Sequence, residues 1–225
     1  IINNSFFDKT NLTFSNNTNI RDWLTIKTKA SYIHSNANKI NQNSNVAGLY
    51  IGLLRTPPDF YNRHYKGTHI DEDGIAYENR QRAYRDYLGA TGSPAYNNPI
   101  WTVEEQLVTS EVSRVIASSE VNITPLNWLI LTLRGGVDSY GDRRDYFFPI
   151  GTANADYNSG RFDEDNISRT EFNFDAIARA NFRISSVFGL GVTAGWNYND
   201  RQRYVNSTSL LGFQADVDIQ TSQLN

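Results

Sequence analysis

The histidines and glycines of this chain do not assemble into a known catalytic or metal-binding motif. His34, His64 and His69 fit neither the HExxH pattern nor another standard zinc spacing. Gly189 and Gly191 do not form a dinucleotide-binding fingerprint, because no βαβ unit follows them. Cysteine is absent from the 225 residues, which excludes disulfides and thiolate ligands. We therefore expect that the chain is not an enzyme and needs no cofactor.

Two acidic turns are the remaining candidates for a bound ion. Residues 71–74, with the sequence DEDG, resemble half of an EF-hand loop. Aligning Gly74 with the invariant glycine of that loop puts His69 at the first ligand position and Arg80 at the twelfth, and neither residue suits calcium. Two alternatives remain for these residues and for residues 163–165: a looser structural calcium site, or an acidic turn exposed to solvent.

Aromatic, amide and basic side chains are dense in residues 37–108, and they are the best candidates for binding chemistry. Aromatic faces stack on sugar rings or peptide side chains, while polar groups orient the ligand. The alternative is that the tyrosines pack this loop against itself or against a partner protein. The candidates for contact with a substrate or partner are Tyr61, Arg63, Tyr65, Tyr84, Tyr87, Tyr96, Asn97 and Trp101.

Alternation of side-chain polarity predicts the elements that position this loop. A period of two is typical of a β-strand, because successive side chains point to opposite faces. We expect antiparallel strands near residues 8–20, 22–35, 109–124, 128–141, 168–184 and 187–203. Over the central positions of each segment, one face carries no charge. The opposite face carries Lys27, Lys29, Arg114, Glu120, Arg134, Asp138, Glu171, Asp175, Arg179 and Arg183.

An uncharged face opposite a polar face is typical of strands that cross an outer membrane. Lysine or arginine on the lipid side costs roughly 2–4 kcal/mol near the bilayer midplane. We expect the uncharged face to contact outer-membrane lipid. The side chains expected to face the lumen are Glu120, Arg134, Asp138, Glu171, Asp175 and Arg179, pairing across strands or contacting a plug or passing solute. A soluble β-sandwich also alternates, but its strands are usually shorter.

The connections are short on one side and long on the other. Tight turns are expected at residues 21–22, 124–127 and 185–186, and long loops at 37–108, 142–168 and from 203 onward. Outer-membrane barrels have short periplasmic turns and longer extracellular loops. Within the first long loop, residues 46–54 have helical spacing before Pro57-Pro58, although two glycines leave a strand possible.

Six strands cannot close a membrane barrel, because the smallest barrels have eight. An open edge in lipid would leave backbone groups without hydrogen-bond partners. The chain also begins Ile-Ile-Asn-Asn, without an initiator methionine. We therefore expect an interior portion of a longer polypeptide that supplies the other strands. The net charge of -3 gives no basic footprint for nucleic acid.

Three stretches resemble the SusC/RagA-type TonB-dependent transporters of Bacteroidota. Residues 53–60 (LLRTPPDF) are similar to the LLRTPP-x-F segment of that family, and residues 97–101 (NNPIW) to its NNP-x-W stretch. Residues 127–129 (NWL), followed by 133–140 (LRGGVDSY), are similar to an ascending strand with the pattern D/N-W-L and then R-x-G-x-D-x-Y. The order and spacing of these motifs match over roughly residues 8–200.

This resemblance implies a fold and a function. The fold would be a 22-stranded outer-membrane barrel with an N-terminal plug, of which this chain holds about six antiparallel strands. The function would be import of glycan or peptide fragments, with a SusD-like lipoprotein over the extracellular mouth and TonB acting through an N-terminal region outside this chain. Two alternatives remain, namely a passive porin or other outer-membrane barrel, and a secreted β-rich module that binds carbohydrate.

Overall fold

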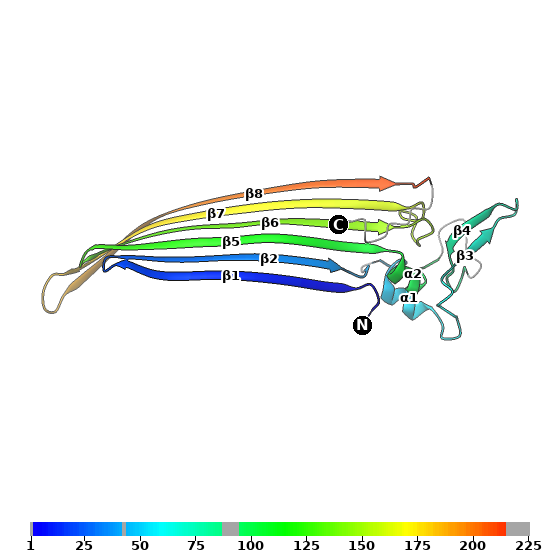
Figure 1. Cartoon of the computed structure of the whole chain (residues 1–225), viewed down its shortest axis with the longest axis horizontal. Helices are drawn as coiled ribbons and strands as arrows, with labels where there is room; N and C mark the ends of the chain where they lie inside the picture. The colour runs from blue at the N-terminus through cyan, green and yellow to red at the C-terminus, as the bar shows by residue number, and fades with distance from the viewer. Residues whose placement is uncertain (1, 42–43, 87–94, 215–225) are drawn as a thin grey trace.

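A single antiparallel sheet dominates the computed structural model, which describes residues 2–41, 44–86 and 95–214. Its strands lie in the order β1-β2-β5-β6-β7-β8, which is their order along the chain once the separate β3-β4 sheet is left out (Figure 1). Their bounds are β1 (Phe6–Arg21), β2 (Leu24–Asn38), β5 (Leu107–Leu126), β6 (Leu129–Phe148), β7 (Arg161–Arg183) and β8 (Gly189–Leu211). The predicted all-β fold of six antiparallel strands is confirmed.

Tight turns join the strands at one end of the sheet. Pairing continues into these turns, because the backbone N–H of Thr124 donates to the carbonyl of Trp23 at 2.8 Å. The N–H of Asn181 donates to the carbonyl of Trp128 at the same distance. At the opposite end the connections are longer, and the first of them carries helices and a second small sheet (Figure 1).

β6, β7 and β8 extend further toward the loop end than the alternation of polarity indicates. The sequence predicts long connections at residues 142–168 and from 203 onward, whereas the structure leaves only residues 149–160 between β6 and β7, and β8 runs to Leu211. Charged side chains lie on both faces of the β6–β7 extension before Phe147 and Phe148 end β6. The Arg143 Nη2 atom lies 2.9 Å from Glu164 Oε2 on one face, and Arg144 and Asp142 form an ion pair on the other. A strand without an apolar face leaves no periodic signal in the sequence.

The connection between β2 and β5 folds into a compact unit. It contains α1 (Leu49–Arg55), β3 (Lys66–Ile70), β4 (Ala76–Gln81) and α2 (Pro99–Glu104). Its described residues, together with residues 149–160, are called the loop body below. The predicted helix lies at α1 and ends before Pro57. The N-cap of α2 is Asn98, whose side chain accepts from the N–H of Ile100 at 2.8 Å.

The buried core lies at the loop end of the molecule, where the loop body meets the strand ends. Its apolar members are Ala37, Ala47, Leu49, Ala83, Tyr96, Trp101, Leu107, Phe147, Phe148 and Ala153. Over the described residues no second layer packs on the long sheet, so the β-sandwich alternative does not describe this fold. None of the described helices has the length and apolar character needed to cross a membrane.

Candidate functional site

The strand register gathers the charged side chains on one face of the sheet. Directly paired residues on neighbouring strands point to the same side. Lys27, Glu120, Arg134 and Asp175 form one such row, in which the sign of charge alternates from strand to strand. The Lys27 Nζ atom lies 3.1 Å from Glu120 Oε1, and Arg134 Nε lies 3.7 Å from Glu120 Oε2. This side of the sheet is called the polar face below.

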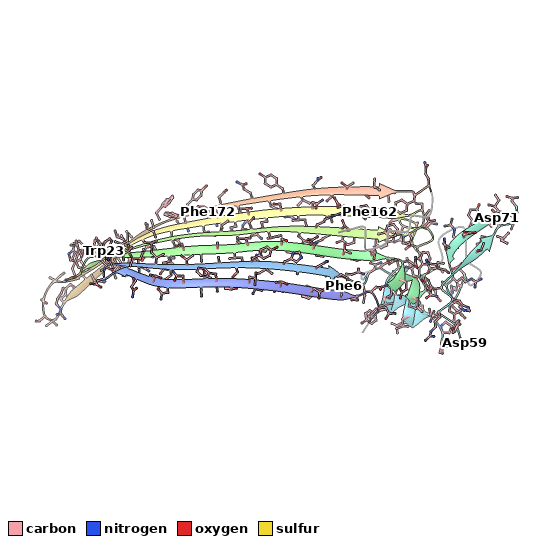
Figure 2. The ribbon with its side chains drawn as sticks, viewed as in Figure 1. Phe6, Trp23, Asp59, Asp71, Phe162 and Phe172 are labelled. Atoms are coloured by element: carbon pink, nitrogen blue, oxygen red, sulfur yellow. The ribbon has the colours of Figure 1, made fainter. Side chains whose placement is uncertain are left out.

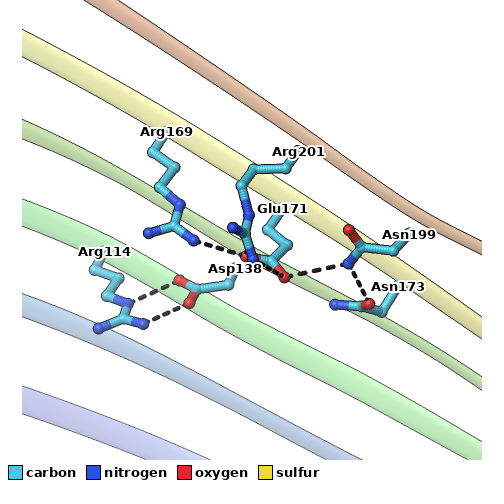
Figure 3. Close-up of polar contacts among 7 residues, drawn as sticks. All are labelled: Arg114, Asp138, Arg169, Glu171, Asn173, Asn199 and Arg201. Carbon is cyan, nitrogen blue, oxygen red and sulfur yellow. Dashed lines mark hydrogen bonds and ion pairs between the residues drawn. The ribbon is translucent and has the colours of Figure 1, made fainter.

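A second set of charged side chains lies nearer the loop end of the polar face (Figure 3). The Arg114 Nε atom donates to Asp138 Oδ1 at 2.7 Å, and a second bond joins Arg114 Nη2 to Asp138 Oδ2. Such a two-pronged contact is the strongest geometry between a guanidinium and a carboxylate. It fixes both side chains across β5 and β6.

Glu171 on β7 is shared by two arginines. Arg169 Nη2 donates to Glu171 Oε2 at 2.9 Å, while the Nε and Nη2 atoms of Arg201 contact the same carboxylate at 3.1 and 3.2 Å (Figure 3). Asn199 also donates to Glu171, at 3.2 Å. One carboxylate therefore faces two guanidinium groups.

Most of the side chains predicted to face the lumen make cross-strand contacts. Asn197 on β8 donates to Asp175 on β7 at 2.7 Å, which adds to the pairs of Glu120, Arg134, Asp138 and Glu171. The sixth residue, Arg179, is aligned with Ile130 and Thr193, and its side chain has no hydrogen bond or ion pair among the described residues. Which solvent or protein surface faces this side of the sheet stays a prediction.

The polar face is hollowed in its middle. A depression of about 470 Å³ is lined by the two lysines of β2 and by Glu120, Arg134 and Asp175. Small residues, among them Ser118 and Gly136, also line it. A Cβ at Gly136 would meet its nearest neighbour, the Ala117 carbonyl oxygen, at an ordinary 3.5 Å. The backbone around Gly136 therefore leaves room for a methyl group.

The opposite face is uncharged along the middle of every strand and is exposed in this chain; it is called the apolar face below. Leu12 is 65% exposed, Phe14 63% and Trp196 60%. The rings of Trp196 and Tyr198 stack with centroids 6.2 Å apart. Side chains project from both faces of the sheet along its whole length, from Trp23 at the turn end past Phe172 to Phe6 and Phe162 at the loop end (Figure 2).

The loop-side limit of the apolar face steps across the sheet. On β1, β2 and β5 the central apolar band ends in one row, which is Leu12, Tyr32 and Val115, and Phe6 lies apart from it nearer the loop end. On β6 and β7 the band ends one row nearer the turns, at Val137 and Phe172. On β8 it ends two rows nearer, at Tyr198, where Asp200 separates it from Tyr204 and Leu210. Strands that tilt against a horizontal boundary produce such a stagger.

Three of the candidate binding residues in the loop are buried. Asn97 is 0% exposed, and its Oδ1 accepts from Gln81 Nε2 at 3.0 Å and from the N–H of Ala153 at 2.7 Å. Trp101 is 1% exposed and directs its indole N–H toward Thr152 Oγ1 at 3.3 Å. The hydroxyl of Tyr96, also buried, donates to the carbonyl of Arg55 at 3.0 Å. In this structure these three side chains hold the loop body together.

Tyr65 lies within the loop body and contacts the segment just before β5. Its hydroxyl donates to Glu105 Oε1 at 2.9 Å, and Lys66 Nζ lies 2.8 Å from the same oxygen. Burial, and after it the hydrogen bond to Glu105, raises the pKa of Tyr65 above its usual range. The phenol therefore stays neutral and acts as a donor.

The other loop candidates reach the surface. Tyr61 is 59% exposed and contacts His64 edge-on at 4.7 Å, and Tyr84 is 44% exposed and contacts Phe60 edge-on at 6.0 Å. Arg63 is also exposed. Tyr87 lies outside the described residues, so its role stays a prediction.

Most of the apolar side chains of α1 are exposed to solvent and not buried. The helix buries Leu49 and Gly52, while Tyr50, Leu53 and Leu54 are exposed by 64%, 53% and 81%. A Cβ at Gly52 would lie 2.7 Å from the carbonyl oxygen of Asn97. Only glycine permits this contact between α1 and the segment before α2. The side of α1 that carries Gly52 is therefore the side that packs against the loop body.

The acidic turns do not form an evident ion site. Asp71 accepts from the backbone N–H groups of Ile75 at 2.8 Å and Asp73 at 3.0 Å, which lowers its pKa. In β7, Asp163 and Asp165 belong to the polar face and Glu164 to the other, so the three cannot converge. Among the described residues no group of three potential ligands is placed to hold a metal ion.

The chain is similar to solved transporter structures. No family model matches it, and neither does any curated protein. It matches the RagAB peptide importer in the closed-closed state with a TM-score of 0.65 and 21% identity, and in the open-open state with 0.66 and 20%. A further structure of the RagAB peptide transporter gives 0.64 and 22%. Each match covers 97% of this chain and 23% of that chain. The likeness shows that the sheet has the fold of part of these transporter chains.

Proposed function

We propose that the chain is part of the barrel wall of an outer-membrane, TonB-dependent importer of the SusC/RagA type. The observation that carries this proposal is the pairing of an uncharged, uncovered face with a face where charges alternate and form ion pairs. An apolar face that runs along all six strands is expected to be covered by lipid or by another protein surface. The likeness to the RagAB transporter chains favours lipid.

The height of the apolar face supports a membrane location. From Phe172 to Phe182 on β7 the chain advances roughly 33 Å along the strand, at about 3.3 Å per residue. With a strand tilt of about 40°, this corresponds to a height of roughly 25 Å, which is the apolar band of an outer-membrane barrel. The turn end would then face the periplasm, and the loop body the outside.

The two edges of the sheet require further strands. β1 and β8 each pair on one side only, so their other backbone groups have no partner strand within the described residues. Such groups cost several kcal/mol each in hydrocarbon. The rest of the polypeptide would supply the neighbouring strands, and an N-terminal region beyond this chain would engage TonB.

The partner would bind at the loop end. The exposed apolar side chains of α1 and the exposed rings of Tyr61 and Tyr84 offer contacts for a SusD-like lipoprotein. The similar structures include those of the RagAB peptide importer, which favours oligopeptides over glycan fragments as cargo. We infer that the chain serves transport and not catalysis.

Two experiments test this proposal on the full-length protein. Cell fractionation should recover it from the outer membrane only with detergent, and recovery from a soluble fraction without detergent would contradict the proposal. A strain lacking the gene, and a strain lacking TonB, should both lose uptake of a labelled oligopeptide. Uptake that depends on the gene but not on TonB would instead indicate a passive porin.

A further inference from the structure

The arginines at the loop end of the polar face exceed the carboxylates that neutralise them. Arg114, Arg169, Arg201 and Arg203 lie in two adjacent rows, accompanied only by Asp138 and Glu171. Asp138 is held by Arg114, and Glu171 by both Arg169 and Arg201. The group thus carries a local surplus of two positive charges, although the whole chain has a net charge of -3.

This surplus is not concealed by packing. The Arg201 side chain is 58% exposed and that of Arg169 is 35% exposed. Each guanidinium carries five N–H donors, and Arg169 uses one of them on Glu171. Arg203 is paired with Arg169 in the sheet register, and its side chain has no carboxylate partner among the described residues. Donors and charge therefore remain available to an incoming anion.

The position of these arginines suits a solute that enters from the loop side. Arg114, Arg169 and Arg203 share a row with Asn11 and Ile33. That row lies just beyond Leu12 and Tyr32, where the apolar face ends. In a closed barrel, the arginines would line the lumen just outside the apolar band, on the loop side of the hollow that contains Lys27 and Lys29. β7 and β8 continue beyond them, to Arg161 and Leu211.

We propose that Arg169, Arg201 and Arg203 form a cationic subsite that selects solutes carrying a carboxylate. The proposal rests on the importer function above and adds a charge preference to it. A planar guanidinium binds a carboxylate through two parallel hydrogen bonds, so an acidic side chain of a peptide or a uronic acid of a glycan would dock in the same way. Glu171 competes with the solute for Arg169 and Arg201 and keeps the subsite reversible.

The test measures binding to the purified full-length transporter. Two labelled oligopeptides are compared that differ only by glutamate or glutamine at one position, and a second pair compares an oligogalacturonate with its methyl ester. The wild type should bind the acidic member of the relevant pair about tenfold more tightly, equivalent to ~1.4 kcal/mol. Preference within the peptide pair or within the glycan pair identifies the source of the carboxylate.

Three variants locate the subsite. The double variant R201A/R203A should abolish the preference while leaving the affinity for the neutral ligand unchanged. Glu171→Gln should increase the preference, because it removes the competing charge but keeps the side-chain shape. Arg183→Ala is the matched control, because it removes an arginine from the polar-face side of β7 at the turn end, and it should leave the preference intact.

Several results would overturn the inference. Equal binding of acidic and neutral ligands by the wild type would do so. A preference that survives in R201A/R203A would also do so, since it would mean that cationic groups other than these arginines produce it. In both cases TonB-dependent uptake of the neutral peptide would leave the importer function standing. Absence of any oligomer uptake by the wild type would instead remove both proposals.

Discussion

Gln81 and Asn97 contact each other at the centre of the loop body, and together they connect four separate segments. Gln81 Nε2 donates to Asn97 Oδ1 at 3.0 Å and to the carbonyl of Gly151 at 3.0 Å. Gln81 Oε1 accepts from the N–H of Asn98 at 2.6 Å. Asn97 Nδ2 in turn donates to the carbonyl of Ala47 at 3.3 Å. These two amides join four segments by hydrogen bonds: β4, the start of α2, the segment before α1 and the β6–β7 connection.

Replacing Asn97 should therefore loosen the loop body without unfolding the sheet. Asn97→Ala leaves the amide of Gln81 and the N–H of Ala153 buried without one of their partners, at about 1–3 kcal/mol for each group. Hydrogen exchange should accelerate in residues 44–60 and 95–104, while exchange in β5 to β7 stays unchanged. Tyr61→Ala, at an exposed position, serves as the control. Unchanged exchange in the loop body of the Asn97 variant would contradict the assigned role.

Gly52 should be intolerant of a side chain even as small as a methyl group. Its Cβ would lie 2.7 Å from the carbonyl oxygen of Asn97, which is a backbone atom that cannot rotate away. Gly52→Ala should displace α1 and destabilise the loop body by about 1–3 kcal/mol. Limited proteolysis between α1 and β3 reports the change. Gly136→Ala is a matched control, because its added Cβ would make ordinary contacts.

A charge on the apolar face should be far more harmful than the same charge on the polar face. Leu133 lies in the middle of the uncharged band, in the row of Ile26 and Val121. Leu133→Arg should lower the stability of the barrel in lipid by roughly 2–4 kcal/mol. Ser118→Arg, which places the same side chain in the hollow of the polar face, should cost much less. Urea titration of the full-length protein in liposomes measures both, and equal losses would contradict the assignment of the faces.

The interaction of Tyr65 with Glu105 predicts an alkaline loss of stability in the loop body. The folded pKa of Tyr65 is raised above its ordinary value of 10.0, chiefly by burial and then by the hydrogen bond to Glu105. The contribution of the neutral phenol is complete below pH 10 and is lost as the pH rises through the folded pKa. Proteolytic protection of the loop body should fall in that alkaline range. Tyr65→Phe should be less protected at neutral pH and should lack this component of the alkaline decline.

The six strands and the charge separation could be predicted from sequence because each strand has one uniform face. Leu24, Ile26 and Tyr32 alternate with Lys27 and Lys29, and this pattern depends only on local spacing. The same signal vanishes where both faces are polar. The alternation therefore predicts a loop for the outer third of β6 and of β7, where Arg143 faces Glu164.

The loop body could not be derived in the same way, because its contacts join residues far apart in the chain. Tyr96, Asn97 and Trp101 have the residue types of a carbohydrate or peptide site, and the sequence does not say that they are buried. Their burial follows from partners such as Thr152 and Ala153, about fifty residues away. One contact of the loop body has a local signal in the sequence. It is the close packing at Gly52, which is indicated by a glycine within a helix.

We expect lipid to cover the apolar face, and water or protein to cover the polar face. Single cysteines at successive positions 129–138 of β6, in an otherwise cysteine-free full-length transporter, can carry a nitroxide label in liposomes. Labels at five alternate positions should collide with lipid-dissolved oxygen: Leu129, Leu131, Leu133, Gly135 and Val137. Labels at the positions between them should collide with a water-soluble nickel complex. Accessibility that does not alternate, or that alternates in the opposite phase, would contradict this expectation.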